Sequence, residues 1–167
     1  MAWEMNYCPV CGHALVDKEM FGRMRRVCPA CGFVFFRDPK VAVGVLVEEG
    51  RRVLLVRRAV VPKVGWWALP AGYMEADEEP QEAARREVRE ETGLEVEVTG
   101  LMDVLPVATH NGRGVLIVYW ARPVGGELRP GDDASEVRWF TAEELPADLA
   151  FESTLMALAR WRSKRRN

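Results

Sequence analysis

The sequence predicts a mixed α/β sandwich, in which a β-sheet is covered by helices, behind a small amino-terminal segment with an architecture of its own. β-rich apolar runs alternate with two helix-forming stretches in the order strands, helix, strands, helix. All four cysteines lie within the first 31 residues. The 167 residues, 49% of them apolar, suffice for one ordinary core with a short appendage and do not comfortably form two full domains.

The amino-terminal cysteines form two matched pairs separated by sixteen residues: Cys8-Pro-Val-Cys11-Gly12 and Cys28-Pro-Ala-Cys31-Gly32. This spacing is typical of a zinc ribbon, because each Cys-x-x-Cys turn presents two thiolates to one ion and the following glycine permits a tight turn. Two disulfides are the alternative, which a reducing cytoplasm disfavours. We therefore expect one structural Zn²⁺ on these four cysteines, with no part in the chemistry. His13 is expected to be a surface residue and not a further ligand.

The remaining elements follow a joint at Arg37-Asp38-Pro39-Lys40, where the residue before proline is driven out of helix. We expect a ribbon over residues 1–36 and a larger domain over residues 37–167. Two β-rich runs flank a charged turn with glycine, which indicates a hairpin. Proline in the first turn and Gly93 at the end favour a central helix, although no Ser or Asn marks its start. The expected strands are 41–47, 53–56, 66–70, 94–98, 101–107, 115–121 and 137–140, with a turn over 110–114; the expected helices are 79 or 80 to 92, and 151–162.

Charge and hydropathy exclude several classes of protein. The net charge of −2 argues against bulk electrostatic binding to nucleic acid or to an anionic membrane. The longest apolar run, 41–47, is far shorter than the roughly 20 residues of a membrane-spanning helix, and the start does not look like a signal peptide. A cytoplasmic protein is therefore expected. The basic run near the carboxy terminus favours a solvated helix end over a nucleic-acid tail; its members are Arg160, Arg162, Lys164, Arg165 and Arg166.

The central helix carries three carboxylates on one face. Glu87, Glu90 and Glu91 stand at i, i+3 and i+4, so that all three project from about one turn. Like charges so placed destabilise a helix unless a cation lies among them, and Mg²⁺ takes oxygen ligands of this kind. A solvated acidic face balanced by neighbouring arginines is the alternative. The three carboxylates alone leave both interpretations open.

A wider pattern around these carboxylates is more specific. Gly72 is followed after five residues by Glu78, and after seven more by Arg86-Glu87-Val88-x-Glu90-Glu91-x-Gly93-Leu94. This is a complete Nudix box, and the chain resembles the Nudix hydrolases from about Lys40 onward. The resemblance implies the Nudix fold, with a mixed β-sheet sandwiched between helices. It also implies Mg²⁺-dependent (or Mn²⁺-dependent) hydrolysis of a small-molecule nucleoside diphosphate linked to another group.

The resemblance assigns a role to each carboxylate of the helix. Glu90 and Glu91 are implied as the principal magnesium ligands, and Glu87 as a further ligand or as the group that orients the attacking water. Metal ions suit this chemistry because they neutralise phosphates that repel a nucleophile and lower the pKa of bound water. Attack on phosphorus is then largely a matter of positioning and charge stabilisation.

Further roles are implied around the helix. Glu78 corresponds to an outer ligand of an additional ion, Arg86 to the arginine that pairs with the carboxylates, and Gly72 to a turn whose carbonyl reaches the metal. Many family members place a general base on a loop before a late strand. Asp133 and Glu136 are the candidates here, with Glu136 the residue we name, and a solvated acidic loop is the alternative.

Comparison of the sequence with particular subgroups of the Nudix hydrolases indicates a substrate class. The proline and aromatic array that NADH pyrophosphatases carry after the box is missing from Leu101 to Val107, which disfavours NADH. The chain is more similar to plant chloroplast pyrophosphatases that act on FAD and ADP-ribose, at Asp38-Pro39-Lys40, from Gly65 into the box, and at Leu149-Ala150-Phe151. The products would be AMP plus ribose 5-phosphate or FMN. A proline of many ADP-ribose enzymes is replaced by His110. Candidates to line a pocket for the base or the second phosphate are Trp66, Tyr73, His110, Arg113 and Phe151.

Other functions remain open from sequence alone. A non-catalytic regulator that binds ADP-ribose is disfavoured because every box carboxylate is present. Nucleoside triphosphates or capped RNA are further substrate classes. For RNA, the ribbon would have to form a basic, aromatic surface from Lys18, Phe21, Arg23, Arg25 and Arg26. A homodimer that builds the pocket from two chains is also left open.

Overall fold

The structure, a computed structural model, describes residues 5–109 and 112–164. The chain forms two compact units, one of Met1–Pro39 with Ala108–Arg113 and one of Lys40–Val107 with Gly114–Asn167. The first unit holds a three-stranded antiparallel sheet in the order β1-β2-β3, formed by β1 (Val16–Met20), β2 (Arg23–Val27) and β3 (Val34–Phe35). Its small core buries Cys8, Leu15 and Cys28.

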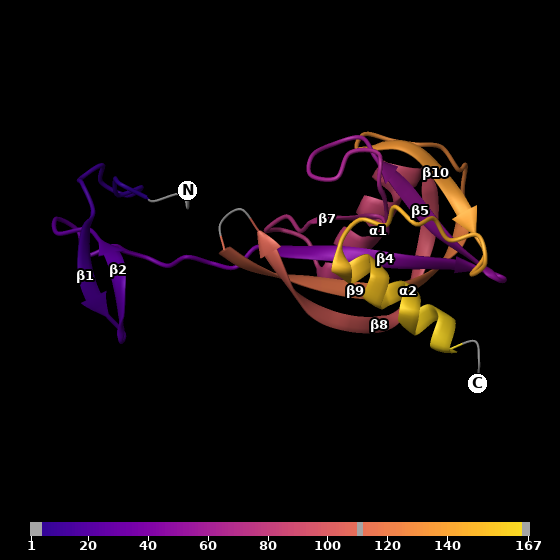
Figure 1. The fold of residues 1–167 in the computed structure, drawn as a ribbon. Helices are drawn as coiled ribbons and strands as arrows, with labels where there is room; N and C mark the ends of the chain where they lie inside the picture. Colours follow the sequence, from indigo (N-terminus) through magenta and orange to yellow (C-terminus); the bar gives the residue numbers. More distant parts are fainter. Residues whose placement is uncertain (1–4, 110–111, 165–167) are drawn as a thin grey trace. The chain divides into compact units, whose positions relative to one another are not determined.

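The larger unit is a seven-stranded mixed sheet with the main strand order β10-β5-β4-β9-β8, to which β6 adds beside β5 and β7 beside β4 (Figure 1). β4 runs parallel to β9 and antiparallel to β5 and β7. The expected hairpin is confirmed, since Glu49 pairs with Arg52 across the turn. The bounds are β4 Val41–Glu49, β5 Arg52–Arg58, β6 Trp67–Ala68, β7 Ala71–Tyr73, α1 Pro80–Thr92, β8 Leu94–Thr109, β9 Gly112–Gly126, β10 Ala134–Phe140 and α2 Glu152–Lys164.

The two helices cover opposite faces of this sheet. Along β4, Val45 packs into the core beneath α1 with Ala84 and Val88, whereas the next residue, Leu46, packs into the core beneath α2 with Trp161. Successive side chains of a strand point to opposite faces, so β4 supplies both layers and is buried from both sides. The predicted sandwich of a mixed sheet between helices is confirmed.

The long β8–β9 pair differs from the expectation of two short strands over 94–98 and 101–107. β8 is one continuous strand of 16 residues. Gly100 lies inside this strand and marks no turn, and a side chain there would meet no neighbour within 4 Å. Val96 packs on the α1 side and Leu105 on the α2 side, so the strand serves both cores. Of the expected 110–114 turn, residues 110 and 111 lie outside the described residues, and Gly112 begins β9.

Helix α1 begins and ends where local chemistry directs. The backbone N–H of Glu79, the residue that precedes the helix, donates to the Glu82 carboxylate at 3.2 Å, as in a capping box, so the start of the helix is held although neither Ser nor Asn is present. Pro80 occupies the first turn, where no N–H is needed. Gly93 ends the helix in the left-handed region at φ 72, and its N–H donates to the carbonyl of Arg89. These interactions fix the two ends of the helix at Pro80 and Thr92.

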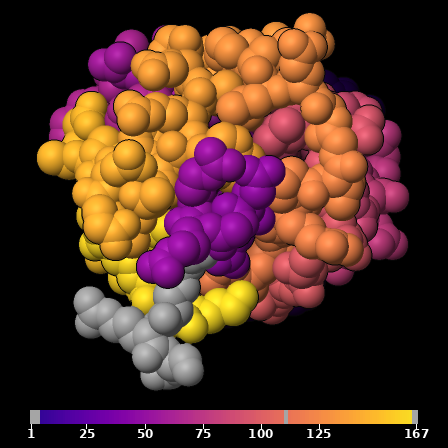
Figure 2. All heavy atoms as spheres, turned by 90° about the vertical axis from the view of Figure 1, so that its right-hand side faces the viewer, coloured from indigo at the N-terminus to yellow at the C-terminus, as the bar shows by residue number. Residues whose placement is uncertain are grey.

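The carboxy-terminal helix is anchored at the β4–β5 turn. Trp161 is fully buried, and its indole N–H donates to Glu48 Oε1 at 3.1 Å. Figure 2 looks onto this end of the domain, where the violet atoms of the turn lie between the orange atoms of the β9–β10 region and the yellow atoms of α2. Two members of the basic run, Arg165 and Arg166, lie outside the described residues. None of the helices in the described part of the chain combines the length and the apolar character needed to cross a bilayer.

Candidate active site

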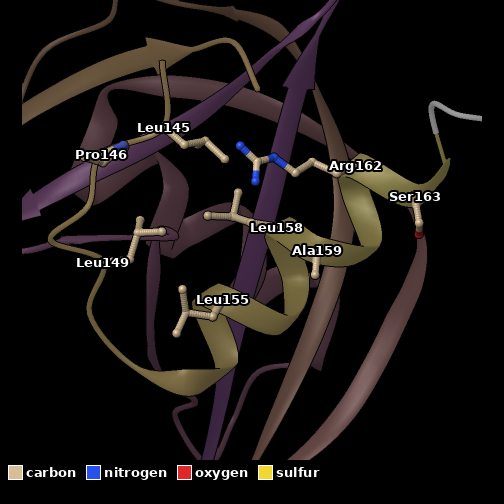
Figure 3. Close-up of a pocket in the computed structure, with 8 residues that line it drawn as sticks. All are labelled: Leu145, Pro146, Leu149, Leu155, Leu158, Ala159, Arg162 and Ser163. Atoms are coloured by element: carbon tan, nitrogen blue, oxygen red, sulfur yellow. The ribbon is translucent and has the colours of Figure 1, made fainter. Parts of the chain in front are cut away.

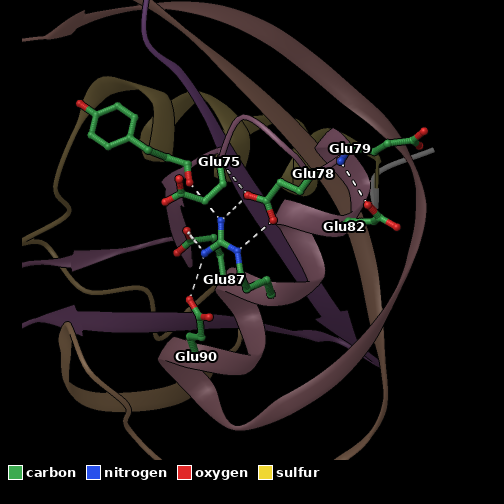
Figure 4. A network of polar contacts seen from close by, with 8 residues as sticks. Glu75, Glu78, Glu79, Glu82, Glu87 and Glu90 are labelled. Carbon is green, nitrogen blue, oxygen red and sulfur yellow. Dashed lines mark hydrogen bonds and ion pairs between the residues drawn. The ribbon is translucent and has the colours of Figure 1, made fainter.

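A single arginine gathers the carboxylates of the box. Arg86 donates from Nε and Nη2 to both oxygens of Glu78, at 2.9 and 2.5 Å. Its Nη1 donates to Glu87 Oε1 at 2.7 Å and to Glu90 Oε2 at 3.0 Å. The network is drawn in Figure 4. A planar guanidinium has its donors in a fixed fork, so these contacts fix the rotamers of three carboxylates at once.

The same arginine ties the loop between β7 and α1 to the helix. Arg86 Nη2 also donates to the carbonyl of Tyr73 at 3.1 Å. The backbone N–H of Glu75 donates to Glu78 Oε1 at 2.8 Å. The hydrogen bonds from Arg86, with that from the Glu75 amide, lower the pKa of Glu78 to about 2. Glu78 is therefore an ionised carboxylate over the whole neutral range, held where the loop meets the helix.

Gly72 and Glu87 lie in direct contact. A Cβ placed on Gly72 would come within 2.2 Å of the Glu87 carboxylate carbon and of both its oxygens. The glycine is needed here because the helix packs its carboxylate against the backbone of β7. Burial raises the pKa of Glu87, and the neighbouring Arg86 opposes this shift.

Glu91 is the most enclosed carboxylate of the three. Its residue is 8% exposed, and one oxygen accepts the backbone N–H of Ala71 at 3.1 Å. Burial, which is the largest cause, raises its pKa to about 8; the charges of Glu87 and Asp133 add to the rise, and that of Arg58 opposes it. A desolvated carboxylate beside further carboxylates is unfavourable unless a cation joins it.

The loop that leads into β10 closes on the end of α1, a feature that the sequence did not indicate. The N–H of Gly131 donates to the carbonyl of Glu91 at 3.0 Å, and the N–H of Arg129 donates to that of Thr92 at 2.9 Å. A Cβ on Gly131 would lie 1.8 Å from the carbonyl oxygen of Glu90, so only glycine fits. The glycine itself was the available signal, but nothing local shows which backbone it approaches.

The two base candidates occupy different surroundings. Asp133 lies near enough to Glu91 for its charge to raise the pKa of that carboxyl. Its carbonyl accepts the N–H of Ala59, which ties the loop to the end of β5. Glu136 lies within β10 and pairs with Arg57, with Nη1 and Oε2 3.4 Å apart. Asp133 therefore acts on the carboxylate cluster through its charge, whereas the carboxylate of Glu136 is engaged in an ion pair.

Candidate pocket residues gather around Arg58, which was not singled out from the sequence. The Arg58 guanidinium lies 5.0 Å from the ring centre of Phe151, and its backbone N–H donates to the carbonyl of Trp66. Lys63 Nζ lies 4.0 Å from the Trp66 ring centre. Two of the candidate aromatic residues are therefore associated with cationic side chains. Tyr73 is half exposed, Arg113 lies in β9, and His110 lies outside the described residues.

An apolar hollow of about 390 Å³ lies on the α2 side of the domain (Figure 3). It is lined mainly by leucines of α2 and of the loop before it, with Arg162 at one end. No box residue lines it, so it is separate from the carboxylate network.

The four cysteines converge in the amino-terminal unit. Their sulfurs all lie within 4.8 Å of one another, and three of the sulfur–sulfur distances are 3.4 to 3.6 Å. A disulfide would bring two sulfurs to about 2.05 Å, whereas a zinc ion with ligands at about 2.3 Å separates them by roughly 3.8 Å. The two turns repeat the same geometry, with Gly12 and Gly32 both at φ 76. The donor set and its spacing fit a tetrahedral ion.

The donor set on α1 fits a different kind of metal. Glu87, Glu90 and Glu91 offer only oxygen ligands, which hard divalent cations such as Mg²⁺ prefer. The buried and desolvated Glu91 is the group that a cation would stabilise most. The residues present therefore suit a magnesium centre at the junction of β7 and α1.

A sheet between two helices, with a loop-and-helix segment that carries clustered carboxylates, defines a hydrolase of the Nudix type. The NUDIX domain family model matches residues 38–159, and the chain belongs to this family.

Three proteins similar to this chain carry more specific names or have a solved structure. An ADP-ribose pyrophosphatase of Methanocaldococcus jannaschii is 39% identical over 132 residues, 77% of this chain and 78% of that protein. The crystal structure of a NUDIX hydrolase from Nitrosomonas europaea matches with a TM-score of 0.89 at 34% identity, over 97% of this chain and 93% of the other. The NAD-capped RNA hydrolase NudC of Chromobacterium violaceum is 30% identical over 81% of this chain, which spans about half of that relative (51%).

Proposed function

We propose that this Nudix enzyme hydrolyses the diphosphate of an ADP-linked small molecule, ADP-ribose first and FAD second, to AMP plus ribose 5-phosphate or FMN. The observation that carries the proposal is the convergence of Glu78, Glu87 and Glu90 on Arg86, beside the buried Glu91. An ordinary acidic helix face would expose its carboxylates and would need no glycine at position 72 to admit one of them. The arrangement is suited to binding cations and, through them, phosphates.

Each residue of the carboxylate cluster has a separate proposed role. Glu90 and Glu91 would hold Mg²⁺ or Mn²⁺, with Glu87 as a further ligand or the group that orients the attacking water, and Glu78 as an outer ligand. When bound, these ions neutralise the diphosphate and make a bound water more acidic. Arg86 positions the carboxylates and touches no substrate in this scheme. The resemblance also implies a metal contact for the Gly72 carbonyl, although Gly72 lies in strand β7, where it pairs with Val43, and not in a turn.

The general base is proposed on the chain that enters β10, where Asp133 lies in the loop before the strand and Glu136 within the strand itself. Glu136 is the residue named from sequence, although its pairing with Arg57 engages its carboxylate. Asp133 has the support of its electrostatic influence on Glu91. Either would accept a proton from the attacking water as it adds to phosphorus.

The amino-terminal cysteines are proposed to hold one structural Zn²⁺ in a ribbon of residues 1–36, with the catalytic domain over residues 37–167. Four thiolates close a tetrahedral shell and leave no position for substrate. The ion would stabilise a segment whose core is very small, since among its described residues the buried cluster consists of Cys8, Leu15 and Cys28.

ADP-ribose is placed first because the relative from Methanocaldococcus jannaschii is named for that substrate and aligns with most of both chains. FAD is added by the likeness of the sequence to plant chloroplast pyrophosphatases. Capped RNA is the second candidate function, supported by the likeness to the NAD-capped RNA hydrolase over 138 residues. NADH and nucleoside triphosphates follow.

A substrate panel tests the proposal. Purified protein with Mg²⁺ is given ADP-ribose, FAD, NADH, diadenosine polyphosphates, nucleoside triphosphates and NAD-capped RNA, and products are identified by mass spectrometry in ¹⁸O water. We expect the highest kcat/KM with ADP-ribose or FAD, and one ¹⁸O in one of the two phosphate products. A higher kcat/KM for triphosphates or capped RNA would overturn the substrate class, whereas no turnover of any diphosphate would overturn the proposed site.

A further inference from the structure

The pleat of the small sheet sorts its charges onto two faces. In an antiparallel pair, directly opposed residues point to the same face and neighbours along a strand point to opposite faces. Lys18 lies opposite Arg25, and Met20 lies opposite Arg23. We call the face that these residues share the cationic face. Its reverse, the opposite face, carries Asp17, Glu19, Met24 and Arg26.

The two faces differ sharply in charge. Three of the four cations of β1 and β2 (Lys18, Arg23 and Arg25) lie on the cationic face, and both acidic residues of these strands lie on the other. The fourth cation, Arg26, is on the opposite face, where it pairs with Asp17 and donates to the carbonyl of Met5. The whole chain has a net charge of −2, but the charged residues that β1 and β2 contribute to the cationic face are all positive.

Two exposed aromatic rings accompany these cations. Phe21, in the turn between β1 and β2, is 73% exposed and stacks on Phe36 with ring centres 6.0 Å apart and planes 22° apart. The Arg25 guanidinium lies 4.7 Å from the centre of the Phe36 ring. Because Phe36 contacts Arg25, the stacked pair borders the cationic face. Rings this exposed contribute little to the ribbon core, which they do not join.

The backbone at Phe21 strengthens this argument. Phe21 adopts φ 54, in the left-handed region that a bulky side chain rarely occupies and that glycine or asparagine would enter at lower cost. Folding alone therefore does not favour phenylalanine at this turn. A large exposed ring held in a costly conformation suggests a role for the ring itself.

We propose that the cationic face and the Phe21–Phe36 pair bind single-stranded nucleic acid. Cations in a row neutralise phosphates, and exposed rings with an adjacent guanidinium provide a platform on which unpaired bases stack. An acidic peptide would use the cations but leave the rings unused. A duplex would keep its bases stacked on each other and out of reach. The proposal does not depend on the identity of the substrate hydrolysed by the Nudix domain.

Binding is measured on the full-length, zinc-loaded protein by fluorescence anisotropy with a labelled single-stranded RNA of twelve mixed nucleotides, without added Mg²⁺. A DNA strand of the same sequence forms a second arm. We expect saturable binding in the range of roughly 10⁻⁶ to 10⁻⁴ M near physiological salt. With three phosphates neutralised, log K should fall against log salt with a slope of about −2. Equal affinities in the two arms, or a preference for RNA, both agree with the proposal.

The decisive variant moves cations between the faces without changing the composition. Exchanging Lys18 with Glu19 (K18E/E19K) and Arg23 with Met24 (R23M/M24R) transfers two cations to the opposite face at constant net charge. The exchange turns the like-charged pair of Lys18 with Arg25 into a favourable glutamate–arginine pair, and it places the two transferred cations, at positions 19 and 24, opposite each other; the number of like-charged cross-strand pairs therefore stays at one and the sheet should still form. We expect weakening on the order of tenfold and a salt slope shallower by about 1.4. Zinc content equal to that of the wild type reports correct folding.

A second pair of variants tests the rings. Phe21→Asn tolerates the left-handed turn, and Phe36→Leu keeps an apolar side chain; each should weaken binding on the order of tenfold without changing the salt slope. Met24→Gln on the opposite face, also highly exposed, is the matched control and should bind as wild type. The proposal is overturned if the face exchange binds as tightly as wild type. Equal displacement of the RNA by polyglutamate of the same charge would also overturn it, since stacking would then contribute nothing.

Discussion

The carboxylate of Glu87 occupies the space in which a side chain of residue 72 would lie. Both carboxylate oxygens are within 2.2 Å of the position of a Cβ on Gly72. Gly72 also forms part of β7, where it pairs with Val43 of β4. The glycine thus sets the distance between the helix that carries the carboxylates and the sheet that supports it.

Gly72→Ala should therefore impair catalysis far more than its size suggests. The added methyl must displace either the Glu87 carboxylate or β7, and misplacement by about 1 Å at a reacting centre costs on the order of 100-fold in rate. Overpacking should also destabilise the fold by about 1–3 kcal/mol. Gly44→Ala, on the adjacent strand, is the matched control, because its Cβ would meet Leu116 at an ordinary 3.5 Å. Steady-state kinetics and thermal unfolding compare the two, and equal activity would contradict the packing argument.

Glu90→Gln and Glu91→Gln should each lower kcat by about two orders of magnitude or more, since each removes a charge from the proposed metal shell. Both should keep near-normal thermal stability, because glutamine has the shape of glutamate and retains an oxygen, which at position 91 accepts the N–H of Ala71 and at position 90 accepts from Arg86. Glu97→Gln is the control, as this exposed carboxylate pairs only with Arg122 among the contacts described. Activity should require Mg²⁺ or Mn²⁺ throughout. Near-normal rates of either variant in saturating Mg²⁺ would show the metal assignment to be wrong.

Arg86→Lys should reduce activity while preserving the charge. A lysine ammonium cannot reach Glu78, Glu87 and Glu90 together, so the carboxylates lose a common anchor. Loss of a partner that orients metal ligands costs about 10–100-fold in metal affinity or activity. We expect the Mg²⁺ concentration for half-maximal rate to rise by a similar factor, which a purely structural defect would not produce. An unchanged Mg²⁺ dependence would indicate that Arg86 serves stability alone.

Asp133→Asn and Glu136→Gln separate the two candidate bases. The residue that accepts the proton should lose kcat by about 10²–10⁴-fold when its carboxylate becomes an amide, whereas the other should remain within a few-fold of wild type. The rates are compared at saturating Mg²⁺ to exclude effects on the metal. Two near-normal variants would place the base elsewhere.

Zinc should be present at one ion per chain and should be released by modification of the ribbon alone. Because all four cysteines of the chain lie in the ribbon, titration with a thiol reagent should release one zinc per four thiols modified. Replacing Cys28 and Cys31 together with serine should abolish zinc binding. Mg²⁺-dependent hydrolysis by the remaining folded domain should continue. Protein prepared without chelators that contains no zinc would contradict the assignment, as would zinc retained by the double variant.

Features encoded locally could be predicted from the sequence. The span of α1 follows from Pro80 and Gly93, and the common face of the three carboxylates follows from helical spacing. The paired Cys-x-x-Cys turns likewise predicted the convergence of four sulfurs that the structure shows.

Features that depend on distant backbone could not be predicted in this way. The approach of Gly131 to Glu90 joins residues 41 positions apart, and no local pattern identifies the partner. The proximity of Arg58 to Glu91 likewise results from the packing of segments that are distant in the sequence. The continuity of β8 through Gly100 was missed because a glycine in a strand resembles a break until its neighbours are known.

The parallel pairing of β4 with β9 also determines when, during folding, the active site can form. Val41 lies opposite Val115, and the carboxylate helix lies within the intervening chain. Closing so long a segment is entropically costly, and contacts of high sequence separation form slowly. Helix α1 can gain its backbone hydrogen bonds early, yet Glu87 meets Gly72 only once β7 has joined β4. In a refolding experiment, hydrolytic activity should therefore return with the slow formation of the central sheet, well after the helical circular dichroism signal.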